Sequence, residues 1–261
     1  MRMYIVNGKN EKMAADVFVS VQKNAPVVLI EHGLAGFKEE GMISAAAEAF
    51  KRCHFTVVTF DARFGLGDSD GDLERANFTH FIEDLKTVAD WVKMQPFYTG
   101  KLVLCGHSLG AGACFYYAAH QDSQVASIVS MAAVVSGKLL LDSYLTHRPD
   151  FVREWQKNRL LAREHLTDKN RRGYISYAHI QDAMRYHLID DMHKIKCPVL
   201  IISADHDISS TFDINEQIYN ALHVQKEMVV IENATHTFKT PQNREDLMQA
   251  IEKWSKKLNF C

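Results

Sequence analysis

The alternation of apolar runs and amphipathic segments predicts buried strands that alternate with helices. Continuous apolar runs are typical of strands covered on both faces, and they occupy residues 26–30, 55–60, 101–105, 125–135, 198–202 and 228–231. Two shorter stretches, 3–6 and 16–21, flank a turn at 7–10 and predict an antiparallel hairpin. Helical spacing of apolar positions fills the intervals over 41–52, 78–94, 108–120, 213–222 and 243–257. This order predicts an α/β fold, with a mostly parallel eight-stranded sheet and helices on both faces.

The segment 138–195 interrupts this alternation and is too long to be a plain loop in a compact domain. No part of it has a convincing strand pattern, so we expect a helical cap (138–195) inserted after the sixth strand of a core formed by 1–137 and 196–261. Trp155, Leu160 and Leu161 are candidates to face the site from this cap, although packing within the cap explains them equally well. Its basic cluster at 169–172 is typical of a solvated helix face.

Composition narrows the classes of partner. The 261 residues carry a formal net charge of −2, which gives no reason to expect nucleic acid or an anionic membrane as partner. No apolar run reaches the ~18 residues of a membrane span, and the first residues have the pattern of a strand. Five cysteines without a Cys-x-x-Cys pair indicate buried free thiols, such as Cys105 and Cys197, and a cytoplasmic location. No motif indicates a metal ion or an organic cofactor. An exposed apolar patch on the cap could support a homodimer.

The strongest chemical signal is Gly-His-Ser-Leu-Gly at 106–110, between a strand pattern and a helix rich in small residues. Gly106 and Gly110 predict a tight strand-to-helix turn on which Ser108 is held in a strained backbone conformation. Such a turn exposes the Ser108 hydroxyl and directs the backbone N–H of Leu109 toward a developing oxyanion. An incidental serine in a glycine-rich turn is the simpler alternative, but the flanking strand and helix argue against it.

A serine hydroxyl needs a base to accept its proton, and the base needs a third group to orient it. The sequence offers an acid at Asp205 or Asp207 after the seventh strand, and His236 after the eighth. The order serine, acid, histidine leaves room for the cap in the first interval. A histidine in a chain with 13 of them is often only structural, but the position of His236 favours the role of base.

These motifs resemble those of the α/β-hydrolase superfamily over nearly the whole chain. The residues concerned are His32-Gly33-Leu34, Asp61-x-Arg63 with the turn at 67–71, the Ser108 motif, Asp207 and His236. The pattern at 32–39 and the Gly-Asp-Ser-Asp-Gly turn also resemble bacterial carboxylesterases of the feruloyl (cinnamoyl) type.

The resemblance implies roles for several further residues. Members usually carry Gly-x-x-Asp after the seventh strand, so Asp207 takes the place of the acid, with Ala204 in place of the glycine and Asp205 as a loop carboxylate. The second oxyanion donor would be the backbone N–H of Leu34. The remaining charged and histidine residues of these motifs are expected to be structural, with Glu31 paired to a basic residue or biasing substrate choice; they are Glu31, His32, Asp61, Arg63 and His107.

The sequence therefore predicts a serine hydrolase of carboxylic esters with Ser108, His236 and Asp207 as triad. Thioesterase and peptidase or amidase activities are alternatives within the same fold. The elbow serine argues against dehalogenase and epoxide hydrolase activity, which require an aspartate there. The alternative from another class is a non-catalytic ligand-binding receptor that keeps the fold.

Overall fold

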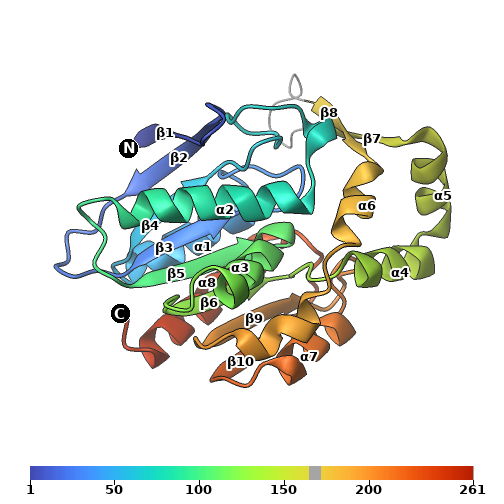
Figure 1. Cartoon of the computed structure of the whole chain (residues 1–261). Helices are drawn as coiled ribbons and strands as arrows, with labels where there is room; N and C mark the ends of the chain where they lie inside the picture. Colours follow the sequence, from blue (N-terminus) through green and yellow to red (C-terminus); the bar gives the residue numbers. More distant parts are fainter. Residues whose placement is uncertain (165–171, 261) are drawn as a thin grey trace.

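The chain forms one eight-stranded sheet and a separate two-stranded sheet. The structure is a computed structural model that describes residues 1–164 and 172–260. The large sheet has the strand order β1-β2-β4-β3-β5-β6-β9-β10, and only the β1–β2 and β2–β4 pairs are antiparallel (Figure 1). Its strands are β1 (Arg2–Val6), β2 (Lys12–Phe18), β3 (Val27–Glu31), β4 (Thr56–Phe60), β5 (Leu102–His107), β6 (Ser127–Met131), β9 (Val199–Ala204) and β10 (Lys226–Ile231).

Helices cover both faces of the large sheet. In Figure 1, α2 and α3 lie in front of the sheet and α1 and α8 lie behind it, which matches the two clusters of buried side chains. The α7 helix packs on the same face as α2 and α3 through Ile214 and Ile218. The core helices are α1 (Gly41–Arg52), the short 3₁₀ helix η1 (Leu73–Arg75), α2 (Phe78–Lys93), α3 (Leu109–His120), α7 (Phe212–Ala221) and α8 (Pro241–Lys257). The predicted α/β-hydrolase architecture is thus confirmed.

Two predicted strands differ from the observed ones by more than two residues at an end, the second and the sixth. The second strand begins at Lys12 rather than at residue 16, because Met13, Ala14 and Ala15 are fully buried against the sheet. The sixth strand ends at Met131, because Ala132 has a left-handed backbone conformation (φ 49°) that ordinary strands do not adopt. The chain beyond Ala132 turns toward Ser108, whose carbonyl accepts the backbone N–H of Val134.

The segment between β6 and β9 contains strands that the sequence analysis did not predict. It is composed of α4 (Gly137–His147), α5 (Pro149–Asn158), β7 (Leu160–Glu164), β8 (Arg172–Ser176), α6 (Ala178–Ala183) and the 3₁₀ helix η2 (Leu188–Lys194). The expectation of a purely helical segment was therefore wrong, since β7 and β8 pair as an antiparallel hairpin. Arg159, in a left-handed conformation (φ 63°), ends α5 and reverses the chain into β7. We call residues 138–195 the insertion; it lies at one end of the large sheet in Figure 1.

The insertion is joined to the core by polar contacts as well as by its two chain ends. The carboxylate of Asp182 in α6 accepts hydrogen bonds from the backbone N–H and the hydroxyl of Thr79, at 2.9 and 2.8 Å. Trp155 is buried between α5 and the hairpin, where its indole N–H donates to the carbonyl of Ile175. The buried side chains of the insertion, among them Trp155, Ile175 and Ile180, thus continue the core cluster that contains α2 and α3.

Candidate active site

The turn between β5 and α3 shows why its two glycines are required. A Cβ atom at Gly106 would lie 2.4 Å from the carbonyl carbon of Gly110, and one at Gly110 would lie 2.5 Å from the carbonyl oxygens of Glu31 and His32. Ser108 itself has φ 55° and ψ −115°, a sparsely populated conformation for a residue with a side chain. The tight packing holds this strained turn, which places the Ser108 side chain at the carboxyl edge of the sheet.

The structure brings Ser108, His236 and Asp207 together. The Nε2 atom of His236 lies 2.9 Å from the Ser108 Oγ, and the Nδ1 atom lies 2.7 Å from a carboxylate oxygen of Asp207. Because the buried carboxylate accepts, Nδ1 carries the proton and Nε2 can accept the hydroxyl proton of Ser108. The other carboxylate oxygen of Asp207 accepts the backbone N–H groups of Ser209 and Ser210, which fixes its orientation.

Asp205, the other candidate acid, has a different position. Its carboxylate accepts the backbone N–H groups of Asn233 and Ala234, both at 2.9 Å, and these hydrogen bonds lower the pKa of Asp205. The backbone N–H of His206 donates in turn to the carbonyl of Ala234. Asp205 thus ties the end of β9 to the loop that carries His236, and it makes no contact with the His236 ring.

The two other histidines near Ser108 are held neutral. The Nε2–H of His107 donates to the carbonyl of His236 at 2.7 Å, while burial lowers the pKa of His107 to about 3. In His32, Nε2 accepts the backbone N–H of Ala62 and Nδ1–H donates to the carbonyl of Gly33. Burial lowers the pKa of His32 as well. Both rings fix loops of the site, which agrees with the structural roles expected for them.

Leu34 and Leu109, the two residues nominated as oxyanion donors, line the same pocket as Ser108, and Leu109 is the first residue of α3. Among the hydrogen bonds of the described residues, the backbone N–H of neither leucine has an acceptor. A Cβ atom at Gly33 would lie 2.9 Å from the Ser108 Cβ, so glycine is what allows the Leu34 loop to approach Ser108.

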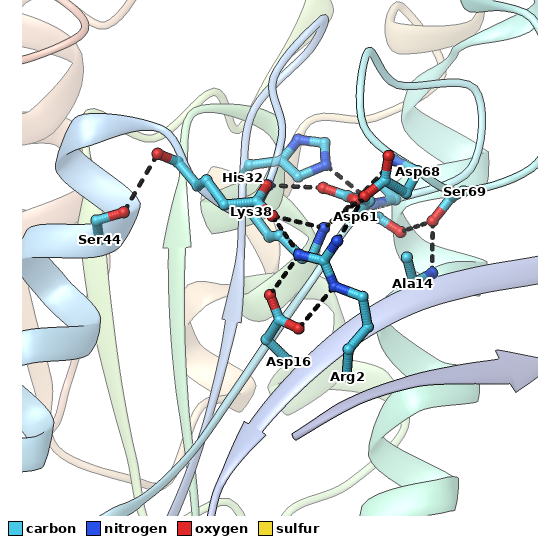
Figure 2. A network of polar contacts seen from close by, with 11 residues as sticks. Arg2, Ala14, Asp16, His32, Lys38, Ser44, Asp61, Asp68 and Ser69 are labelled. Carbon is cyan, nitrogen blue, oxygen red and sulfur yellow. Dashed lines mark hydrogen bonds and ion pairs between the residues drawn. The ribbon is translucent and has the colours of Figure 1, made fainter.

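A buried ion pair joins Lys38, in the loop after β3 that also contains Leu34, to Asp61 at the end of β4 (Figure 2). Asp61 is fully buried and accepts three hydrogen bonds: from the Lys38 ammonium (2.7 Å), from the Lys38 backbone N–H (2.7 Å) and from the Asp68 backbone N–H (2.9 Å). Burial disfavours the charged ammonium, but the hydrogen bond and charge of Asp61 outweigh it and raise the pKa of Lys38. At the surface, Arg2 extends the network by pairing with Asp16, Glu39 and Asp68.

Arg63, the second residue of the Asp-x-Arg motif, also has a structural environment. Its guanidinium is buried and pairs with Asp84 at 2.5 Å and with Glu83 at 3.0 Å, and it also contacts Glu11. These contacts tie the loop after β4 to α2 and to the first hairpin. Neither Asp61 nor Arg63 lines the pocket that contains Ser108.

Glu31 departs from its expected environment. Its side chain is fully buried at the end of β3, and neither carboxylate oxygen has a hydrogen-bond partner. The prediction of a partnered carboxylate was therefore wrong. Burial, with a smaller effect of the nearby Asp84 charge, raises the pKa of Glu31 well above its usual value and so favours the neutral form of the carboxyl.

A pocket of about 990 Å³ opens above Ser108 and His236. One wall belongs to the core and includes Leu34, Met42 and Thr237. The insertion supplies the other wall, which is mostly apolar. Its larger apolar residues are Leu140, Tyr144, Phe151, Trp155, Leu161, Ile175 and Ile180, and its polar ones include Arg148, Arg163 and His179. Two of the three residues that the sequence nominated from the insertion thus line the pocket, whereas Leu160 does not and is 37% exposed. The basic cluster at 169–171 lies outside the described residues.

The described residues give little support for a metal site or a membrane-spanning helix. Among the described residues, no group of three or more histidine, cysteine, aspartate or glutamate side chains could hold a metal ion. The thiols of Cys105, Cys114 and Cys197 are free and buried, as expected for the first and third of them. In residues 1–164 and 172–260, no helix has the length and apolarity needed to cross a membrane.

The sheet order and the turn at Ser108 define the chain as an α/β-hydrolase. Within that class, the sequence model of the family described as "Serine aminopeptidase, S33" matches residues 22–240, and the chain belongs to this family.

Curated relatives of the chain are distant. An uncharacterized 31.7 kDa protein of Escherichia coli is 26% identical over 225 residues, which is 76% of this chain and 78% of the relative. The lysophosphatidylserine lipase ABHD12 of Danio rerio is 25% identical over 77% of this chain, but only 48% of the lipase is covered. The mitochondrial palmitoyl-protein thioesterase ABHD10 of Bos taurus is 22% identical over 84% of this chain and 70% of the thioesterase.

Solved structures agree with the fold. The esterase Est1E from Butyrivibrio proteoclasticus, in a complex with ferulic acid, has a TM-score of 0.79 at 19% identity, with 98% of this chain and 99% of that chain covered. The mouse α/β hydrolase domain-containing protein 10 has a TM-score of 0.77 at 16% identity, with 99% of each chain covered. At these identities the likeness shows the fold, and the chemistry must be argued from the site.

Sequence reasoning missed residues whose roles depend on contacts distant in the chain. Lys38 was noted only as part of the 32–39 pattern and was given no role, although it is the buried partner of Asp61, 23 residues away. Tyr144, whose hydroxyl lies 3.1 Å from the Ser209 Oγ beside Asp207, was missed. The place of Lys38 in that pattern was a signal for its role, but nothing local distinguishes Tyr144 from other insertion tyrosines.

Proposed function

We propose that the protein is a serine hydrolase that cleaves carboxylic esters of small to medium acyl or aromatic groups through an acyl-enzyme. The observation that carries the proposal is the continuous hydrogen-bonded chain from Asp207 through His236 to the Ser108 hydroxyl. Membership of a hydrolase family supports it, as do the esterase, lipase and thioesterase named among the similar proteins.

In the proposed mechanism, His236 Nε2 removes the hydroxyl proton while Ser108 Oγ attacks the ester carbonyl carbon. Asp207 stabilises the imidazolium that forms. The imidazolium then gives its proton to the departing alcohol, and the acyl group stays on Ser108. Water repeats the sequence with His236 as base, which releases the acid and restores the enzyme.

The backbone N–H groups of Leu34 and Leu109 form the proposed oxyanion hole. Both lack an acceptor among the described residues, and the second lies at the N-terminus of α3, where the helix dipole favours negative charge. Loss of one such donor typically removes about 2.7–4 kcal/mol of transition-state stabilisation.

The insertion is proposed to act as the cap of this site. Its apolar wall faces Ser108 across the pocket and would hold the acyl or aromatic part of the substrate away from water. The cytoplasmic location and the homodimer stay predictions.

A thioesterase or peptidase activity is the alternative within the fold. The family description names an aminopeptidase, and one relative is named a palmitoyl-protein thioesterase. The same three residues would serve all of these reactions, because each passes through a tetrahedral oxyanion.

The test compares wild type with Ser108→Ala and with the control Ser44→Ala, which removes an exposed hydroxyl on α1 that contacts only the Glu39 carbonyl. A panel of p-nitrophenyl esters of graded acyl size, a thioester and an anilide are compared by kcat/KM. Turnover that depends on Ser108 and is highest for an ester supports the proposal. Equal turnover by wild type and Ser108→Ala, or no labelling of wild type by a fluorophosphonate, contradicts it and favours a non-catalytic receptor.

A further inference from the structure

The charged residues that line the pocket are strongly unbalanced. Four basic side chains line it, two from the insertion (Arg148 and Arg163) and two from the core (Lys239 and Arg244). Among the described residues that line the pocket, Glu40 is the one acidic residue. A pocket with this composition, in a protein whose formal net charge is −2, is a local concentration of positive charge.

Glu40 does not neutralise these cations. It is 8% exposed, and a Cβ atom at Gly36 would lie 2.8 Å from one of its carboxylate oxygens, so the side chain is packed against the Leu34 loop. Burial, with a contribution from the charge of Asp61, raises the pKa of Glu40 to about 8. At neutral pH the described part of the pocket lining therefore carries more positive than negative charge.

Arg148 and Arg163 belong to the part of the pocket lining that the insertion supplies. Tyr144 and Ser209 line the same pocket, and the Tyr144 hydroxyl lies 3.1 Å from the Ser209 Oγ. Burial raises the pKa of the Tyr144 hydroxyl, while its hydrogen bond with Ser209 and the charges of Arg163 and Arg148 act to lower it. The backbone N–H of Ser209 donates to Asp207, so this part of the lining adjoins the proposed triad acid.

Neither Arg148 nor Arg163 has a hydrogen-bond acceptor from the protein within the part of the chain that the structure describes, and both residues are exposed. The Arg148 guanidinium lies 5.3 Å from the centre of the Phe151 ring. Two other arginines of the insertion are paired: Arg153 with Asp150, and Arg185 with Asp182 at 3.3 Å. Unpaired guanidinium groups that line the pocket of Ser108 are available to bind an anionic ligand.

We propose, on the basis of the esterase function proposed above, that the substrate is an amphiphilic ester with an anionic group, and that Arg148 and Arg163 bind this group. The anion is a carboxylate or a phosphate, the two groups whose geometry suits a pair of guanidinium forks. The apolar wall of the insertion, with Phe151 and Trp155, holds the hydrocarbon part of the substrate. Arg148 and Arg163 are thus specificity-determining residues of the site.

The core pair is a weaker candidate for the same role. Arg244 donates from its guanidinium to the Lys239 carbonyl at 3.0 Å, and this guanidinium packs on the backbone at Gly41. Arg244 therefore has a structural partner, whereas Arg148 and Arg163 have none among the described residues. Lys239 and Arg244 therefore provide an internal comparison for the effect of Arg148 and Arg163.

The kinetic test uses two matched pairs of chromogenic esters. Mono-4-nitrophenyl suberate and 4-nitrophenyl nonanoate have acyl chains of similar length that end in a carboxylate and in a methyl group. In the second pair, 4-octanoyloxy-3-nitrobenzoate carries the anion on the leaving group and 4-nitrophenyl octanoate is neutral. We expect wild type to favour the anionic ester of at least one pair by about tenfold in kcat/KM. This factor is what one or two charge-assisted hydrogen bonds contribute to binding at a partly exposed site.

Variants then test the assignment. Arg148→Gln/Arg163→Gln should abolish the preference through KM, with kcat and the neutral esters changed less than about twofold. The control Arg153→Gln/Arg185→Gln also removes two positive charges from the insertion, but at positions that do not line the pocket. It should keep the preference for anionic esters. The assignment to Arg148 and Arg163 is overturned if the control also loses the preference for anionic esters, or if only Lys239→Gln/Arg244→Gln loses it. A wild-type protein that prefers neutral esters overturns it as well.

A binding measurement separates this proposal from the proposed catalysis. The Ser108→Ala protein is titrated with octanoate, octyl phosphate and 1-octanol by calorimetry. Tighter binding of octanoate or octyl phosphate than of 1-octanol, lost in the Arg148→Gln/Arg163→Gln background, supports the proposal even if the wild-type protein hydrolyses no ester. The stronger of the two anions identifies the group. Equal binding of all three ligands overturns the proposal of an anion site. If turnover still depends on Ser108 in that case, the proposed esterase function is unaffected.

Discussion

Replacement of Lys38 by methionine is expected to affect both stability and catalysis, because Lys38 and Asp61 hold the loop that carries the Leu34 N–H. The change removes the ammonium that donates to Asp61 at 2.7 Å and keeps the aliphatic volume of the side chain. Asp61 keeps only the two backbone N–H donors from Lys38 and Asp68.

The size of the expected loss of stability follows from the burial of Lys38 and Asp61. The side chains of Lys38 and Asp61 are 1% and 0% exposed, so water cannot replace the lost partner. Removing one member of a buried ion pair typically costs about 3–5 kcal/mol, because a buried charge is left without compensation. The contacts of the ammonium with Glu39 and Asp68 are lost as well, but these carboxylates are partly exposed and contribute less. We therefore expect a loss of about 3–5 kcal/mol in the free energy of unfolding.

Catalysis should fall as well. A displaced Leu34 N–H would remove part of the ~2.7–4 kcal/mol that one oxyanion donor supplies, so kcat should fall by about tenfold or more while KM changes little. In Lys38→Met/Asp61→Leu the uncompensated charge is absent, and part of the lost stability should return.

Urea unfolding followed by circular dichroism, together with kcat for a p-nitrophenyl ester, measures both effects. The control is Lys86→Met, which breaks an exposed Lys86–Asp90 pair on α2 and should cost at most about 1 kcal/mol. If Lys38→Met were no less stable than the Lys86 variant and retained wild-type kcat, the ion pair would not support the loop, and this reasoning would be refuted.

Two further predictions concern single carboxylates. The folded protein keeps Glu40 protonated up to a pKa of about 8, whereas an unfolded glutamate ionises near 4.5, so wild type loses stability as pH rises through this window. Glu40→Gln should therefore gain stability relative to wild type between those pH values in urea titrations; a difference independent of pH would contradict this. Asp205→Ala removes the acceptor of the Asn233 and Ala234 N–H groups and should lower kcat by up to ~10²-fold through a displaced His236, with little change in melting temperature. An unchanged kcat would show that the histidine loop does not need this carboxylate.

The main fold and the proposed triad could be predicted because their signals are local. Strands covered on both faces appear as continuous apolar runs, such as Val27–Glu31, and the glycines around Ser108 mark a turn that admits no other residues. The order of the strands then places the loops after β5, β9 and β10 at one edge of a parallel sheet.

Contacts between distant segments could not be predicted in this way. The strand β7 contains Arg163 and Glu164 within five residues, and it is stabilised by its partner β8 and by Trp155, so its own sequence has no clear period. The Lys38–Asp61 pair and the solitary Glu31 are equally invisible, since a sequence does not show which buried carboxylate meets a cation.

The fixed tautomers of His32 and His107 simplify how the enzyme should respond to acid. Each ring must accept or donate one particular hydrogen bond, and burial disfavours the uptake of a second proton by either. Under the proposed mechanism, neither of these two rings should therefore add a proton to the acid limb of a plot of log(kcat/KM) against pH. Both would serve the reaction only as rigid struts, and a change of pH in the working range of the protein would leave the loops they hold in place.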